Sequence, residues 1–401
     1  MNKVLYPVNG VRLAAASAGS YGQNRDDLAL FSLCADARIS AVFTRNRFCA
    51  APVSIARAHL RQGTARYLLV NAGNANAGTG ARGVADALQV CRALASRAGS
   101  EPEAVLPFST GVIGEYLPVD KICRALPTLL DKLAADAWHD CARAIMTTDT
   151  RPKARSVQFS LDGKTATVTG IAKGAGMIKP DMATMLAFIA TDAALARPVL
   201  DRILAAAVQQ SFNRICVDGD TSTNDACVLV ATGQGEGSNQ PITENSPACR
   251  QLEQQVTALC IGLAQDIVRD AEGATKFVTV QVNNAASEAD CEALAAAITT
   301  SPLVKTALYA SDPNWGRILA ALGRSKAARL DINKVCIYLN QVCIVTHGAR
   351  AADYTEEQGA AAMQQDEIDI RIDLNQGAAC ACYWTCDLSH DYVTINAEYR
   401  T

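Results

Sequence analysis

The most informative stretch of the chain reads Lys173-Gly-Ala-Gly-Met-Ile-Lys-Pro-Asp-Met-Ala-Thr-Met-Leu-Ala-Phe188. Glycines, a lysine and a proline precede Thr184, and an apolar segment follows it. This order is typical of a threonine that attacks the peptide bond before it, here Ala183–Thr184. The new N-terminal threonine is a self-sufficient nucleophile, because its free α-amine serves as general base for its own hydroxyl. The pattern also fits a plain loop before a core strand, with Thr184 as a β-branched strand former.

Other segments extend the pattern over nearly the whole chain. In chain order they are Asn71-Ala-Gly-Asn-Ala-Asn76, Ser109-Thr-Gly-Val-Ile-Gly-Glu115, Met146-Thr-Thr-Asp-Thr150, Ser211-Phe-Asn-Arg214, Asp218-Gly-Asp-Thr-Ser-Thr-Asn-Asp225, Glu272-Gly-Ala-Thr-Lys276, Ser311-Asp-Pro-Asn-Trp-Gly-Arg317 and Asp391-Tyr-Val-Thr-Ile-Asn-Ala-Glu-Tyr-Arg-Thr401. Each motif is ordinary alone, and the ordered set is specific. On these residues the chain resembles the ornithine acetyltransferase family, also called the bifunctional glutamate N-acetyltransferase family.

The resemblance implies a fold and a domain organisation. The fold is a layered α/β arrangement, an αββα sandwich similar to the self-processing L-aminopeptidase/D-esterase group. A catalytic region over residues 1–275 is followed by a C-terminal α/β domain over 276–401. Cleavage between Ala183 and Thr184 yields an α chain, 1–183, and a β chain, 184–401. These fragments are expected to stay associated, as a heterotetramer of two α and two β chains.

The resemblance also implies a reaction. Thr184 takes the acetyl group from N-acetylornithine, and the acetyl-Thr ester then passes it to glutamate, a ping-pong step of cyclic arginine biosynthesis. The Thr110 side chain and the Gly111 backbone N–H fill the oxyanion hole, which needs two donors aimed at one developing charge. The residues that line the substrate pocket are Thr147, Lys173, Thr184, Glu272, Asn396 and Thr401. Neither a cofactor nor a metal is required.

Charge chemistry suggests how that pocket divides its work. Both substrates carry a carboxylate, and ornithine adds a cationic side chain, so the pocket needs a cation and an anion. Lys173 is the natural contact for a carboxylate or acetyl oxygen, and Glu272 the natural partner for an ammonium. The same two residues are also compatible with an ordinary surface pair. Whether acetyl-CoA is an additional donor stays open, because no residue decides it.

Composition narrows the class of protein further. The 401 residues carry a formal net charge of −3 and no basic block, which argues against nucleic acid and anionic membranes as partners. No run approaches the roughly 18 apolar residues of a membrane-spanning helix. The N-terminus lacks the apolar core of a signal peptide. The odd count of 15 cysteines favours reduced thiols, so we expect a cytoplasmic protein.

Hydrophobic periodicity predicts a mixed α/β protein. Strands are expected at 28–34, 40–44, 67–70, 166–172, 276–282, 335–339, 342–346 and 367–374, with a hairpin turn at Asn340-Gln341. Helices are expected at 83–97, 129–145, 198–211, 251–270 and 288–299. A final strand is expected to carry Asn396 and Thr401 back to the pocket.

Three other motifs resemble binding sites for a dinucleotide, calcium or zinc. Gly78-Thr-Gly-Ala-Arg-Gly83 matches the dinucleotide fingerprint of a dehydrogenase, but residues 71–77 intervene where that motif needs a tight turn. The loop from Asp218 begins like a calcium loop, yet lacks its central glycine and final glutamate. Cys380, Cys382 and Cys386 lack the paired spacing of a zinc site.

A second enzyme class stays open on the same fold. In a self-processing amidase or aminopeptidase, water would replace glutamate as the acceptor. Transfer and hydrolysis differ in how well water is excluded, which no sequence motif reveals. The four histidines, His59, His139, His347 and His390, lie in unrelated contexts and form no Ser-His-Asp arrangement. Their scatter favours a nucleophile that supplies its own base.

Overall fold

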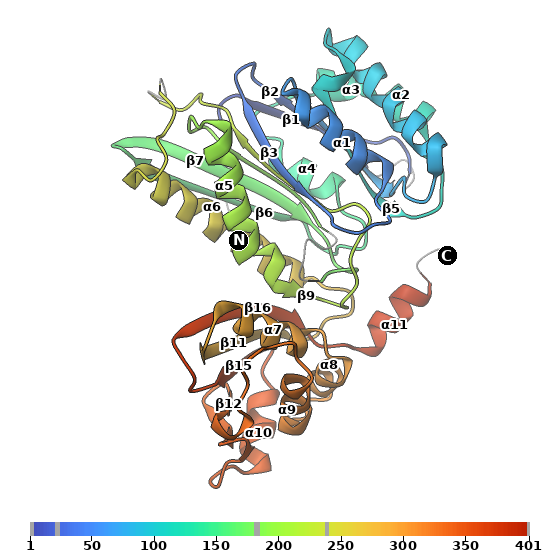
Figure 1. The fold of residues 1–401 in the computed structure, drawn as a ribbon. Helices are drawn as coiled ribbons and strands as arrows, with labels where there is room; N and C mark the ends of the chain where they lie inside the picture. Colours follow the sequence, from blue (N-terminus) through green and yellow to red (C-terminus); the bar gives the residue numbers. More distant parts are fainter. Residues whose placement is uncertain (1–3, 21–24, 180–184, 237–239, 399–401) are drawn as a thin grey trace. The chain divides into compact units, whose positions relative to one another are not determined.

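The computed structural model describes residues 4–20, 25–179, 185–236 and 240–398 (Figure 1). The chain divides into two compact units. The first comprises Met1–Gly174, Asp181–Asn213 and Thr221–Ile267, and the second comprises Ala175–Pro180, Arg214–Asp220 and Val268–Thr401. Two short segments, 175–180 and 214–220, thus belong to the second unit, although the chain returns to the first unit after each of them. The expected domain boundary at 275/276 stays a prediction.

Two sheets form the centre of the first unit. Within the described residues, one has the order β1-β2-β4-β5 and the other the order β3-β10-β8-β7-β6. The strands of the first are β1 (Val11–Ala16), β2 (Leu28–Leu33), β4 (Tyr67–Asn74) and β5 (Val105–Val112); those of the second are β3 (Arg38–Phe43), β10 (Ala226–Ala231), β8 (Leu186–Thr191), β7 (Lys164–Lys173) and β6 (Lys153–Leu161). Strands β4 and β5 are parallel, as are β8 and β10.

The two sheets pack face to face through aromatic side chains. The Phe188 ring on β8 lies 5.1 Å from that of Phe31 on β2 and 5.0 Å from that of Phe108 on β5, measured between centroids. Strand β8 is buried along its whole length, which is why its sequence is continuously apolar and not alternating. The same core takes in α4 (Trp138–Ala144).

Helices cover the outer faces of both sheets (Figure 1). On the four-stranded sheet the cover comes from α1 (Ala51–Gln62), α2 (Gly80–Ala98) and α3 (Val119–Asp131), with the 3₁₀ turn η1 (Pro102–Ala104) beside them. On the five-stranded sheet it comes from α5 (Arg197–Gln210) and α6 (Pro247–Arg269), and Leu259 of α6 packs over Gly170 of β7. The predicted αββα layering is confirmed.

The second unit is built on a mixed sheet with a separate core. The strand order is β14-β13-β12-β15-β11-β16-β9 within the described residues. The strands are β14 (Ala349–Arg350), β13 (Val342–Thr346), β12 (Cys336–Leu339), β15 (Glu367–Asp373), β11 (Phe277–Ala285), β16 (Ala379–Cys386) and β9 (Ile215–Cys216). The helical elements are α7 (Glu288–Thr299), α8 (Pro302–Tyr309), α9 (Trp315–Gly323), α10 (Glu356–Met363), α11 (His390–Ala397) and η3 (Ile332–Lys334). The 3₁₀ turn η2 (Phe212–Arg214) lies where the chain passes from the first unit into the second. The predicted hairpin at Asn340 is confirmed.

Three expected elements differ from the structure. The helix predicted at 129–145 is broken, because Ala134 exchanges backbone hydrogen bonds of 2.7 and 2.8 Å with Leu13 on β1. The strand predicted to end at residue 70 continues to Asn74, because β5 pairs with it that far. The final strand is wrong: Asn396 lies on α11, a helix capped by the Ser389 hydroxyl.

Candidate active site

Thr110 and Gly111 lie near the C-terminal end of β5, against β4. Gly111 has φ of +130°, in the region that favours glycine. A Cβ added to it would lie 2.3 Å from the carbonyl carbon of Gly73 and 2.6 Å from the amide nitrogen of Asn74. Both obstacles are backbone atoms, so no side chain can move to make room. The position requires glycine, and the close pairing holds its amide in place.

Lys173 ends β7 and brings two of the other expected residues together. Its Nζ donates to Thr147 Oγ1 at 2.8 Å and to Thr110 Oγ1 at 3.2 Å. Its side chain is only 4% exposed, so the surface-pair alternative is wrong for this residue. An ammonium group only donates hydrogen bonds, so both threonine oxygens act as acceptors toward it. Each hydroxyl proton is thereby left to point elsewhere, as an oxyanion donor at Thr110 requires.

A buried carboxylate, Asp149, organises this group. Its Oδ1 accepts from Lys153 Nζ at 2.5 Å and from the Gly174 amide at 2.7 Å, and its Oδ2 accepts from the Thr147 amide at 3.0 Å. The same Oδ2 lies 4.0 Å from Lys173 Nζ. Burial raises the pKa of Asp149, but Lys173, Lys153 and the amide outweigh it and hold that pKa below its usual range. Asp149 is therefore an anion, and with two ammonium groups it leaves one net positive charge.

The sequence motif 146–150 contains Asp149, but the family resemblance implies a site role only for Thr147. The signal that could have found Asp149 is the spacing Asp149-x-x-x-Lys153, a carboxylate and an ammonium close along the chain. The buried pairing itself depends on β6 and β7 lying side by side, which no local motif records.

The chain downstream of the expected cut enters the site at Met185. Ala183 and Thr184 lie outside the described residues. The Met185 amide donates to Asp225 Oδ1 at 2.9 Å, and the Met185 carbonyl accepts from the Ala226 amide at 3.1 Å. The next residue, Leu186, is paired with Lys173 across β7 and β8. The residue bonded to Thr184 is thus held at the strand end that carries Lys173.

A network of amide side chains braces the oxyanion strand. Asn224 Nδ2 donates to the Ser109 carbonyl at 2.9 Å and to the Ala75 carbonyl at 2.7 Å. The Ser109 hydroxyl donates to Asn71 Oδ1 at 2.5 Å. All of these groups are buried. The asparagine-rich segment 71–76 therefore supports the backbone beside Thr110.

The glycine motif 78–83 has a steric explanation. A Cβ added at Gly83 would lie 1.9 Å from the Thr79 hydroxyl and 2.4 Å from Asn76 Oδ1. Asn76 Nδ2 also donates to the Gly83 carbonyl at 2.9 Å. These contacts tie the loop to the first turn of α2 and account for its small residues without a dinucleotide.

Glu272 and Asn396 meet in the second unit. Asn396 Nδ2 donates to Glu272 Oε2 at 2.8 Å, and the Glu272 amide donates to the Ala175 carbonyl at 2.9 Å. A Cβ added at Gly176 would lie 2.4 Å from the Glu272 carboxylate. Gly176 therefore lets the glycine-rich approach to the expected cut lie against this carboxylate. Thr401 lies outside the described residues.

The metal alternatives find no support in the described residues. The Asp218 carboxylate accepts from the amides of Met177, Ile178 and Asp220 at 2.5, 3.0 and 3.2 Å and from the Tyr392 hydroxyl at 3.2 Å. Across the ranges that the structure describes, no three His, Cys, Asp or Glu side chains are grouped to hold a metal ion. In the same ranges, no helix has the length and apolarity needed to cross a membrane.

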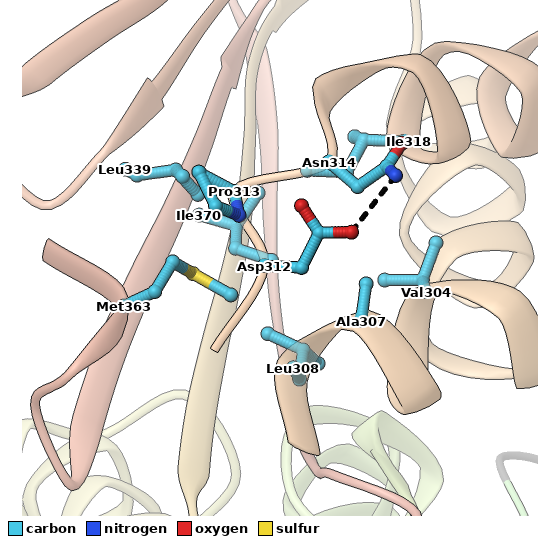
Figure 2. A pocket seen from close by; sticks show the side chains of 10 residues that line it. All are labelled: Val304, Ala307, Leu308, Asp312, Pro313, Asn314, Ile318, Leu339, Met363 and Ile370. Atoms are coloured by element: carbon cyan, nitrogen blue, oxygen red, sulfur yellow. Dashed lines mark hydrogen bonds between the residues drawn. The ribbon is translucent and has the colours of Figure 1, made fainter. Parts of the chain in front are cut away.

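A small cavity in the second unit is not the candidate site. Figure 2 shows it lined by mostly apolar side chains from α8, α9, α10 and the sheet, with the Asp312 carboxylate accepting from Asn314 Nδ2 at 3.0 Å. None of the expected site residues lines it. The lining residues include the Asp312 carboxylate but no cationic side chain. The cavity therefore lacks one of the two charges that bind amino-acid substrates. The segment 311–317 forms a turn that lines this cavity and also forms the start of α9.

Comparison with known proteins identifies the family of the chain. The arginine biosynthesis bifunctional protein ArgJ of Methylococcus capsulatus is 54% identical over 398 residues, covering 99% of this chain and 97% of that protein. A solved structure of the ArgJ protein of Bacillus halodurans is 36% identical over 52% of this chain and 96% of its own, with a TM-score of 0.49. A solved structure of ornithine acetyltransferase from Mycobacterium tuberculosis, complexed with ornithine, is 32% identical. The match covers 45% of this chain and 93% of that chain, with a TM-score of 0.38. A model of the ArgJ family matches residues 12–401, so the chain belongs to the ArgJ family.

Proposed function

We propose that the protein transfers an acetyl group from N-acetylornithine to glutamate through an acetyl ester on Thr184, after cutting itself between Ala183 and Thr184. As a member of the ArgJ family, it is an acyltransferase of arginine biosynthesis. The observation that carries the proposal is Lys173, which donates to Thr110 and Thr147 at the strand end facing Leu186. Lys173 therefore contacts Thr110 and Thr147 through its side chain and pairs through its backbone with the strand that follows Thr184.

The acyl step assigns a task to each group. The α-amine of Thr184 takes the hydroxyl proton as the oxygen attacks the acetyl carbon, and later gives it to the departing amine. The Thr110 hydroxyl and the Gly111 amide stabilise the negative charge that develops on the acetyl oxygen. The net positive charge around Asp149 favours that oxyanion further. These donors are held by backbone pairing, so little reorganisation accompanies the step.

Substrate recognition in this proposal uses both charges. Lys173 and Thr147 take the acetyl oxygen or the carboxylate, where a buried ammonium makes a strong charge-assisted hydrogen bond. Glu272 takes an ammonium of ornithine or glutamate, oriented by its hydrogen bond from Asn396. Thr401 completes the pocket from the C-terminus. In the ping-pong sequence, ornithine leaves before glutamate enters the same pocket.

The proposal includes an assembly and a compartment. The α chain, 1–183, and the β chain, 184–401, stay together, and two of each form a heterotetramer. Strand pairing of β7 in the α chain with β8 in the β chain supports their association. All of the cysteines are unpaired in the structure, which supports a reducing compartment, the cytoplasm. The catalytic region, 1–275, and the C-terminal domain, 276–401, are the proposed functional division.

One experiment separates the candidate activities. Purified protein is examined by intact mass and then assayed for N-acetylglutamate formation from N-acetylornithine and, separately, from acetyl-CoA. We expect cut chains and transfer from N-acetylornithine, with the acetyl-CoA arm deciding whether the enzyme has the second donor. Release of free acetate without N-acetylglutamate would instead identify an amidase in which water is the acceptor.

A further inference from the structure

Asp225 is a buried carboxyl group that the acyl step does not use. It precedes β10 and is 1% exposed. Its Oδ1 accepts from the Met185 amide at 2.9 Å, and its backbone carbonyl accepts from the Thr44 amide at 3.0 Å. Its Oδ2 is buried, and the described residues offer it no hydrogen-bond partner within bonding geometry. One oxygen is therefore fixed on the chain after Thr184, and the other makes no hydrogen bond of normal geometry to the described residues.

A buried oxygen without such a hydrogen bond has a cost and a chemical consequence. Leaving such a group unsatisfied costs about 1–3 kcal/mol, and more when it is charged. Burial raises the pKa of Asp225 well above its ordinary value, although the Met185 amide, Lys173 and Ser222 act in the opposite direction. A carboxyl group with a raised pKa is a stronger base when ionised and a usable acid when protonated. Proton transfer in two directions uses both properties.

The uncut chain has a proton-transfer problem that the mature enzyme does not have. In the mature enzyme the α-amine of Thr184 is the base. Before the cut that nitrogen belongs to the Ala183–Thr184 peptide bond, where its lone pair is delocalised and is not basic. Self-cleavage therefore needs another group to move the hydroxyl proton, and the titratable groups proposed above, Lys173 and Glu272, are assigned to substrate binding.

Covalent connectivity places Asp225 within reach of that chemistry. The Met185 nitrogen is bonded to the carbonyl carbon of Thr184. Met185 is therefore one peptide link from the residue whose hydroxyl attacks. Asp225 Oδ1 lies 2.9 Å from the same nitrogen. Among the hydrogen bonds of the described residues, Asp225 is the titratable side chain that contacts Met185.

Resting on the proposed function, we infer that Asp225 carries the proton for self-cleavage. Its carboxylate accepts the Thr184 hydroxyl proton while the oxygen bonds to the Ala183 carbonyl carbon. The carbon–nitrogen bond then breaks, and the Asp225 acid returns the proton to the departing nitrogen. The product is an ester of Ala183 on Thr184 with a free α-amine. Water hydrolyses that ester, and the amine takes the proton released as the Ala183 carboxylate forms.

The inference distinguishes cleavage from acetyl transfer. Once the α-amine is free it is the base for the acyl step, so Asp225 is dispensable as a proton carrier there. Asp225→Asn keeps an oxygen for the Met185 amide and cannot carry a proton. We expect this variant to cut itself about 10²–10⁴-fold more slowly, the usual worth of positioned acid–base catalysis. The molecules that do cut should transfer acetyl at close to the wild-type rate per cut chain.

A matched control comes from the other end of β8. Asp192 is likewise buried and accepts a backbone amide, that of Thr167, at 2.8 Å. Asp192→Asn removes a comparable buried charge and should cut at the wild-type rate. Cleavage is followed by intact mass after synthesis of each full-length chain, and thermal melting confirms that each variant is folded.

Chemical rescue separates proton transfer from support of the fold. Asp225→Ala leaves room for formate, which supplies a carboxylate without the side-chain link, and formate should accelerate its cleavage. Wild-type cleavage of Asp225→Asn, or an Asp225→Ala chain that formate does not accelerate, would overturn the inference. A wild-type chain that never cuts contradicts the proposed function itself, and this inference then falls with it.

Discussion

Replacing Thr110 with alanine removes one proposed oxyanion donor and leaves the other contacts of Lys173 in place. Thr110 is 6% exposed, and its hydroxyl accepts from Lys173 Nζ at 3.2 Å. Lys173 keeps its shorter hydrogen bond to Thr147, at 2.8 Å, and Asp149 at 4.0 Å. The Gly111 amide is set by its close approach to Gly73 and is unaffected. The variant thus isolates the contribution of one hydroxyl.

The expected effect is much larger on the reaction than on the fold. Losing one preorganised oxyanion donor lowers kcat by about 10²–10³, equivalent to about 2.7–4 kcal/mol of transition-state stabilisation. Losing one of several hydrogen bonds to a buried ammonium costs the fold about 1.5–3 kcal/mol at most. Melting should therefore shift by a few degrees while turnover falls by orders of magnitude.

Steady-state acetyl transfer on cut enzyme measures this. Thr110→Ser is the matched control, because it restores the hydroxyl and omits only a methyl group. We expect the serine variant to recover most of kcat, with the Lys173 contact intact. If Thr110→Ala turned over normally, or if the serine variant were as slow as the alanine variant, the hydroxyl would not be an oxyanion donor.

Two further substitutions and one deletion test other parts of the proposed site. Gly111→Ala forces a Cβ into the β4 backbone and should lower both stability and kcat, measured by melting and steady-state kinetics. Asp149→Asn leaves two buried ammonium groups without their counter-charge and should destabilise the protein by about 3–5 kcal/mol, measured by denaturant unfolding. Deleting residues 397–401 removes Thr401 and leaves Asn396 as a chain end; self-cleavage should survive while kcat/KM for transfer collapses, and wild-type kinetics would show a purely structural terminus.

Much of the layered fold could be predicted from hydrophobic pattern because it is local. The apolar run after Met185 becomes β8, buried on both faces. The hairpin at Asn340 and the helix 288–299 likewise follow from turn chemistry and periodicity. The break at Ala134 could not be predicted, since it depends on pairing with a strand more than 100 residues away. The helix at 390–397 is weakly amphipathic and exposed, so its sequence carries little periodic signal.

The site divides in the same way. Thr110, Gly111, Thr147 and Lys173 were predicted through whole-motif resemblance, and the structure brings the first, third and fourth into direct hydrogen bonding. Asp149 was missed because its importance lies in a buried charge balance that forms only when separate strands meet. Asp225 ends a polar loop in the sequence, and its hydrogen bond to the Met185 amide depends on the pairing of β8 with β10.

The central claim is that Thr184 becomes an N-terminal nucleophile. Intact mass combined with N-terminal sequencing of wild-type protein and Thr184→Ala tests it most directly, with acetyl transfer assayed on the same samples. The account predicts two wild-type fragments, 1–183 and 184–401, the second beginning Thr-Met-Leu-Ala. It also predicts one intact, inactive chain for the variant. A single uncut wild-type chain with full acetyl-transfer activity would contradict it.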